Sequence, residues 1–141
     1  MTADRITYFD EPEARVLDLR PDGVDCIPVL GLTDRRSIHH AIGMHYHPGC
    51  MEFCLCLKSN TSFVTPEREY PYRPGRIFVS SPSQPHHLRA NPRGLKHYWL
   101  LFEIPKPGRR ILGLDARGSE WLSRSLPPLP MRLFASTHDV R

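Results

Sequence analysis

GMHYHPGCME, at residues 43–52, is the stretch that decides the fold of this chain. Side chains alternate between two faces in an extended chain, so His45 and His47 are expected on one face. The same alternation puts Glu52 out of phase with the two histidines. Three cysteines share its face: Cys50, Cys54 and Cys56. We therefore expect Pro48 and Gly49 to absorb one residue as a loop or bulge, so that the imidazoles and the carboxylate converge inside a barrel.

A second stretch, RPGRIFVSSPSQPHH at residues 73–87, supplies another histidine, His86, after a turn, a short strand and a loop. Two imidazoles, a carboxylate and this further imidazole suit one divalent transition metal with open positions: iron, nickel, manganese or zinc. The candidate metal ligands are His45, His47, Glu52 and His86. The residues leave a second interpretation open, in which these histidines bond to one another and line an ordinary polar pocket.

Composition limits what can surround these motifs. A chain of 141 residues is expected to form one domain. Its 15 prolines and 9 glycines exclude long helices, because an interior proline removes a hydrogen bond and clashes with the preceding turn. Turns recur at intervals of about 8–12 residues, which is typical of a β-sandwich or barrel. The expected strands are residues 26–32, with Pro28 marking an edge, and residues 51–57, 63–65, 76–79 and 95–104.

Charge and hydrophobicity exclude several classes of protein. The sequence contains no apolar run of the ~18 residues that suggests a membrane span and no signal peptide, so we expect a cytoplasmic protein with reduced thiols. The net charge of +4 comes from scattered arginines, which does not indicate nucleic-acid binding by this chain itself. Cys54 and Cys56 have no charged neighbour to activate them and are interpreted as small core residues.

The two stretches resemble the two motifs of the cupin family, Gly43-x-His45-x-His47-x4-Glu52 and Pro74-Gly75 through Pro85-His86. Residues 73–87, together with HYWLLF at 97–102, are further similar to AraC-type transcription regulators. Two positions depart from the cupin motifs: His39 replaces a glycine and Ala90 an asparagine. The resemblance implies an all-β fold, a cupin β-barrel (jelly roll), with short C-terminal helical segments.

The resemblance also implies a function, the sensing of a small-molecule effector, most simply a sugar or related metabolite, without catalysis. The ligand-binding residues that it implies are Thr33, His47, His86, His97 and Trp99. Leu88 replaces a pocket tyrosine of the arabinose sensor, which argues against arabinose itself. The alternative is a metal-dependent cupin enzyme, a dioxygenase or a sugar isomerase, favoured by the intact His/His/Glu/His set. For His97, a role as a hydrogen-bonded core residue stays open.

The expected organisation is an N-terminal arm (1–25), the cupin barrel (26–107) and a tail (108–141). In the tail, residues 119–126 are expected to form two helical turns with Trp121, Leu122 and Leu126 on one side. Ser136 or Thr137 is a suitable N-cap, so the chain is expected to stop where a further helix begins. Regulators of this type contact DNA through a helix-turn-helix domain, which we expect to lie outside this chain. We also expect that the chain can form a homodimer.

Overall fold

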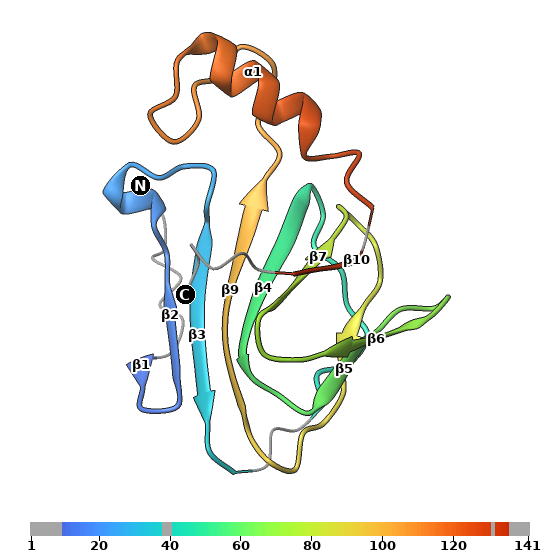
Figure 1. The fold of residues 1–141 in the computed structure, drawn as a ribbon. Coiled ribbons are helices and arrows are strands. Elements are labelled where there is room, and N and C mark those ends of the chain that lie inside the picture. Colours follow the sequence, from blue (N-terminus) through green and yellow to red (C-terminus); the bar gives the residue numbers. More distant parts are fainter. Residues whose placement is uncertain (1–9, 38–40, 131, 136–141) are drawn as a thin grey trace.

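The computed structural model describes residues 10–37, 41–130 and 132–135, and its strands form two antiparallel sheets (Figure 1). The larger sheet has the strand order β1-β2-β3-β9-β4-β7-β10 and the smaller one β6-β5-β8. The strands are β1 (Asp10–Glu11), β2 (Ala14–Leu17), β3 (Val29–Arg35), β4 (Cys50–Lys58), β5 (Thr61–Val64), β6 (Glu69–Tyr72), β7 (Arg76–Ser80), β8 (His87–Leu88), β9 (Leu95–Glu103) and β10 (Arg132–Ala135). The helices are a 3₁₀ turn, η1 (Arg20–Asp22), and α1 (Ala116–Ser125). This architecture confirms the predicted all-β class.

Glycines in the turns let the strands double back. Gly75, in the turn before β7, has a φ of +75°, and Gly94, in the turn before β9, has a φ of +79°. Only glycine adopts this left-handed conformation without steric cost. A Cβ on Gly94 would also overlap the main-chain carbonyl of Arg35, at the end of β3. This turn therefore tolerates no side chain, which fixes the approach of β9 to β3.

Aromatic rings and two thiols fill the space between the sheets. Phe63 of β5 stacks on Phe78 of β7, with ring centroids 3.9 Å apart, and Tyr72 of β6 meets Phe63 edge-on. Cys54 and Cys56 lie in the same cluster, each 1% exposed and not in a disulfide. Burial raises the pKa of Cys56 to about 12 and also raises that of Cys54, so both thiols stay protonated at neutral pH. Their predicted role as small core residues is confirmed.

The strand predicted at residues 26–32 is shifted. β3 begins at Val29, directly after Pro28, because proline has no N–H to donate to the ladder. The prediction that Pro28 marks an edge is wrong, since β3 lies between β2 and β9 inside the larger sheet. The edge is formed instead by β1 and β2, so the sheet extends into the segment assigned to an N-terminal arm.

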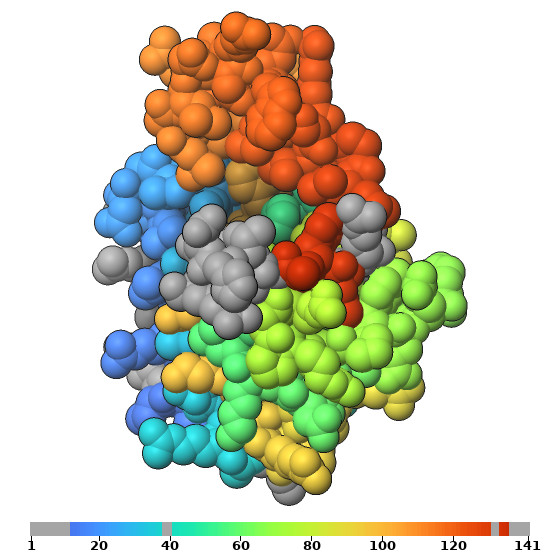
Figure 2. Space-filling model, in the orientation of Figure 1, coloured from blue at the N-terminus to red at the C-terminus, as the bar shows by residue number. Residues whose placement is uncertain are grey.

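The segment after β9 contains α1, which forms one end of the molecule (orange to red in Figure 2). The Asp115 side chain caps α1 by accepting a hydrogen bond from the Gly118 amide at 2.7 Å, so the helix begins three residues before the predicted position. The sequence analysis placed Trp121, Leu122 and Leu126 on one side; in the structure the two leucines are half-buried, whereas Trp121 is 66% exposed. Ten residues hold too few turns to fix an apolar stripe from sequence alone.

After α1 the chain returns to the larger sheet, where β10 pairs with β7. Among the described residues, no helix has the length and apolar character needed to cross a bilayer. The helix start predicted at Ser136 or Thr137, and the departure from the cupin motif at His39, lie outside the described residues.

Candidate metal centre and adjoining cavity

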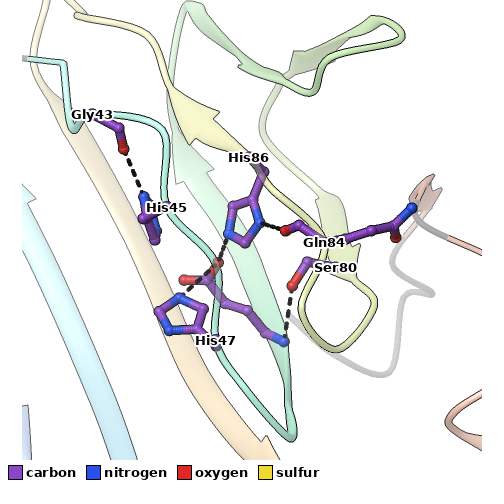
Figure 3. A network of polar contacts seen from close by, with 7 residues as sticks. Gly43, His45, His47, Ser80, Gln84 and His86 are labelled. Atoms are coloured by element: carbon purple, nitrogen blue, oxygen red, sulfur yellow. Dashed lines mark hydrogen bonds and ion pairs between the residues drawn. The ribbon is translucent and has the colours of Figure 1, made fainter.

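Three imidazoles and one carboxylate converge at one point of the barrel (Figure 3). One donor atom from each of these residues lies within 4.8 Å of all the others: His45, His47, Glu52 and His86. The convergence expected from the two sequence stretches is therefore present. It arises from three parts of the chain, because Glu52 is on β4, His86 precedes β8, and the other two histidines precede β4.

His45 and His47 are not in a continuous strand, which corrects the predicted strand–turn–strand passage. His45 forms an isolated β-bridge with His86, in which each amide donates to the carbonyl of the other residue, at 3.0 and 2.9 Å. The chain then turns at Pro48 and Gly49. Gly49 has a φ of +69°, and the Cys50 amide donates a hydrogen bond to the His47 carbonyl, so the chain changes direction here. This turn takes up the phase difference between the histidines and Glu52, as predicted.

Hydrogen bonds to main-chain carbonyls fix the tautomers of two of the histidines. Nδ1 of His45 donates to the Gly43 carbonyl at 2.8 Å, and Nδ1 of His86 donates to the Gln84 carbonyl at 2.9 Å. A carbonyl oxygen only accepts, so Nδ1 carries a hydrogen in both rings, and Nε2 is the nitrogen that can offer a lone pair to a metal ion when the ring is unprotonated. This is the arrangement of metal-binding histidines, whose second nitrogen is held by an outer hydrogen bond.

One carboxylate oxygen of Glu52 lies near the imidazoles of two histidines. Its carboxylate Oε2 lies 2.8 Å from Nε2 of His86 and 3.9 Å from Nε2 of His47. The main-chain amide of Glu52 donates to Oγ of Ser80 on β7 at 3.1 Å, which anchors β4 at this point. Two lone pairs cannot face each other at 2.8 Å, so either a proton or a cation must bridge Glu52 and His86.

The pKa shifts follow from this geometry. Burial alone would lower the pKa of His86 and raise that of Glu52, but the hydrogen bond between them and their opposite charges outweigh it. The pKa of His86 is therefore raised and that of Glu52 lowered, both of which favour the charged pair. For His47, burial outweighs the attraction of Glu52 and lowers the pKa, so this ring is held neutral.

The residues present fit a transition metal ion. Nε2 of His47 is buried and has no hydrogen-bond partner among the described residues, although its edge faces Glu52. An unpartnered buried nitrogen is costly unless a ligand satisfies it. Three imidazole nitrogens and one carboxylate oxygen are a donor set that divalent iron, nickel, manganese and zinc all accept.

A cavity of about 290 Å³ adjoins the metal-ligand cluster. His45, His47 and Glu52 form one part of its wall. Three of the predicted ligand-binding residues line another part: Thr33, His97 and Trp99. His86 is not among the lining residues; it is 1% exposed, and its Nε2 contacts the Glu52 carboxylate. The sequence prediction thus named four residues that line one cavity and a fifth, His86, that contacts the lining residue Glu52.

His97 is held from the second sheet. The Tyr72 hydroxyl lies 3.3 Å from Nδ1 of His97 and has no other hydrogen-bond partner among the described residues. Tyr72 is fully buried, and burial raises its pKa well above the usual value, so the phenol keeps its hydrogen. Donation from the phenol to Nδ1 satisfies this hydrogen, and a neutral His97 ring would then carry its own hydrogen on Nε2. A core contact and a cavity-lining position coexist in this one residue.

Other cavity residues escaped the sequence analysis. Ala14 and Val16 of β2 and Arg35 of β3 line the cavity, and so does Leu88, which the sequence analysis had named only as a substitution. The one available signal was parity, since Arg35 lies two residues after Thr33 and so shares its face. Nothing local indicated that β2 would pair with β3 and bring its inner face to the same cavity.

The curled antiparallel sheets and the His/His/Glu/His cluster define a protein of the cupin fold. A solved structure with this fold is a predicted oxalate decarboxylase from Thermotoga maritima, 12% identical, with a TM-score of 0.53, over 64% of this chain and 80% of that one. The polyketide cyclase RemF from Streptomyces resistomycificus is 18% identical, with a TM-score of 0.49, over 78% of each chain. The manganese-containing oxalate decarboxylase of Bacillus subtilis is 15% identical, with a TM-score of 0.47, over 88% of this chain and 37% of that one.

Within the cupins, the family model of the AraC-like ligand binding domain matches residues 28–109, which is more than half of the chain. The chain therefore belongs to the family of AraC-like ligand binding domains. A search of curated protein sequences finds no match to it.

Proposed function

We propose that this chain is the effector-sensing domain of an AraC-type transcription regulator and that it binds a sugar or a related small metabolite in the cavity beside the histidines. The observation that carries the proposal is the pairing, in one wall, of the Trp99 indole with the polar side chains of Thr33 and His97. A flat apolar surface beside a few fixed polar groups suits the C–H faces and hydroxyls of a sugar.

A divalent transition metal, held by the cluster of His45, His47, Glu52 and His86, is part of this proposal. Three of the four residues also line the cavity, so a bound ion would supply a Lewis-acidic position for an effector oxygen. His86 is outside the cavity wall, so toward the effector it would act only through the ion and through Glu52, which lies 2.8 Å from it, while His47 lines the cavity. Metal analysis of the purified chain, beside a variant with both His45 and His47 replaced by alanine, tests this part.

The remaining parts of the proposal concern partners. DNA contact belongs to a helix-turn-helix domain outside these residues, and the domain is proposed to pair as a homodimer in the cytoplasm. Specific retardation of promoter DNA by this chain alone would contradict the first point. Sedimentation of the purified chain tests the second.

Titration calorimetry with neutral and acidic sugars tests the sensing role. Trp99→Ala is expected to weaken binding of a sugar that the native chain binds by about 1–3 kcal/mol, the scale of a buried aromatic contact. A thermal melt of the same variant shows whether the domain still folds. Normal binding by Trp99→Ala would remove Trp99 from the proposed site, and no binding by the native chain to any sugar would overturn the sensing proposal.

A metal-dependent cupin enzyme is the second candidate, favoured by a complete ligand set that opens onto a cavity. Its test is turnover: the metal-loaded chain is incubated with the same sugars under air and without oxygen, and products are measured. Product formation that depends on Glu52 would favour the enzyme over the sensor.

A further inference from the structure

One arginine in the cavity wall has a side chain with no partner among the residues that the structure describes. Arg35, the last residue of β3, shares the inner face with Thr33 and contributes to the cavity wall. Its side chain makes no hydrogen bond or ion pair with any residue that the structure describes, although its main chain pairs with Leu95 in the ladder with β9. The neighbouring acid does not serve it, because Asp34 points to the opposite face and pairs with Lys96 at 2.8 Å.

Among the described residues, one carboxylate lines the cavity, and its strand position is distant from that of Arg35. Glu52 pairs with Leu101 and Arg35 with Leu95, so the two lie six residues apart along β9. Six residues span about 20 Å of backbone at ~3.3 Å per residue, so the two side chains arise from well-separated positions along the ladder. Glu52 is moreover engaged with His86. The positive charge of Arg35 is therefore open to a ligand, and a negative group there is spared repulsion by Glu52.

Arginine has the chemistry of an oxyanion receptor. Its guanidinium stays charged, and its planar fork of N–H donors matches the oxygens of a carboxylate or a phosphate. A guanidinium in a partly enclosed cavity loses some of its hydration, which a bound oxyanion replaces with charge-assisted hydrogen bonds. A neutral sugar would leave that group without a charged partner.

We propose that Arg35 binds an oxyanion of the effector, so that the effector is an acidic sugar derivative, carrying a carboxylate or a phosphate, rather than a neutral sugar. This inference rests on the proposed sensing function and narrows its ligand class. The polar part of such a ligand lies along Thr33 and His97, between Arg35 and the metal cluster.

The test is calorimetry with ligands that share a carbon skeleton and differ in charge: glucose, glucuronate and glucose 6-phosphate, then galactose and galacturonate. An acidic member is expected to bind the native chain about 10- to 100-fold more tightly than its neutral counterpart, the scale of a charge-assisted hydrogen bond. Preference for the uronates identifies a carboxylate, and preference for the phosphate ester identifies a phosphate.

Arg35→Gln removes the charge and is expected to abolish the preference for the acidic sugar over its neutral counterpart. Arg36→Gln is the matched control, because it makes the same charge change at the next residue, which is exposed and outside the cavity wall. Arg35→Lys keeps the charge without the planar fork and is expected to retain part of the preference. Raising the salt concentration should weaken binding of the acid to the native chain more than to Arg35→Gln.

Equal affinity for neutral and acidic sugars, or an equal loss in Arg36→Gln, would overturn the role of Arg35 and leave the sensing proposal standing. Absence of binding by every member of the panel would overturn both. Thermal melts of each variant separate a local effect from unfolding, and Arg35→Lys provides the measurement if Arg35→Gln does not fold.

Discussion

Gly31 and Trp99 lie opposite each other across the β3–β9 ladder, and the Trp99 indole covers the backbone of Gly31. A Cβ at position 31 would overlap the ring atoms of the indole. Glycine at this position therefore allows the indole to lie against the sheet, where it forms part of the cavity wall. The shape of the wall depends on a residue that itself contributes no side chain.

Gly31→Ala is expected to displace the Trp99 indole, because backbone strands move less easily than a ring. Overpacking of this kind costs about 1–3 kcal/mol of folding stability. The measurement is tryptophan fluorescence with urea unfolding, in a Trp121→Phe background that removes the exposed second tryptophan. Gly43→Ala is the control, since a Cβ there meets no atom within 4 Å. Unchanged emission and stability in Gly31→Ala would contradict the contact.

Glu52→Gln is expected to abolish metal binding, because a neutral amide neither ligates a transition ion well nor balances the charge of His86. It should also destabilise the metal-free domain by about 3–5 kcal/mol, the cost of leaving one member of a buried charged pair alone. Elemental analysis and urea unfolding measure the two effects. Glu69→Gln, which alters an exposed pair with Arg89, should change neither. Retention of one ion per chain by Glu52→Gln would exclude the cluster as the metal site.

Metal affinity is expected to rise with pH and to fall steeply in acid. A bound ion needs an unprotonated Nε2 on each histidine, so protons compete with it below the ordinary imidazole pKa of ~6.5. The pair with Glu52 raises the pKa of His86, so the competition begins above that value, whereas the lowered pKa of His47 delays its own protonation. Competition titrations with a chelator between about pH 5.5 and 8.5 measure this dependence. Affinity independent of pH would exclude histidine ligation.

Tyr72→Phe is expected to remove the donor to Nδ1 of His97 while keeping the ring that packs on Phe63. Loss of this buried hydrogen bond is expected to cost about 1–3 kcal/mol in stability. If Tyr72 had only a structural role, the loss of stability would be the sole effect. Loss of the donor should also let the His97 tautomer change, which ¹⁵N chemical shifts of the imidazole report. Tyr46→Phe, at an exposed position, is the matched control. An unchanged tautomer would contradict the assigned donor.

The parts of the site that were predictable are those encoded over short distances. Alternation along residues 50–56 placed Glu52 with the cysteines, and the structure keeps that parity in β4. The turn at Gly49 was predictable because proline followed by glycine punctuates a strand. These features depend on neighbours in the sequence, and local rules describe them well.

The parts that were missed depend on pairing between distant segments. Val16 reaches the cavity only because β2 pairs with β3, and Arg35 reaches it only because β3 pairs with β9. Neither pairing leaves a local pattern in the sequence. The exposure of Trp121 was not predictable for a different reason. The periodicity of a short helix groups its apolar side chains, but it does not indicate which of them another element covers.

The strand order of the larger sheet has a consequence for the behaviour of the protein at high concentration. β1 and β10 occupy the two edges of this sheet, so segments near either end of the described chain shield its inner strands. β10 pairs with β7 along its length, covering amide and carbonyl groups that flank the apolar side chain of Ile77. An uncovered edge of this kind recruits strands from other molecules. Deleting β10 would therefore turn a well-behaved domain into one prone to aggregate through its exposed edge, even though no residue of the cavity had been touched.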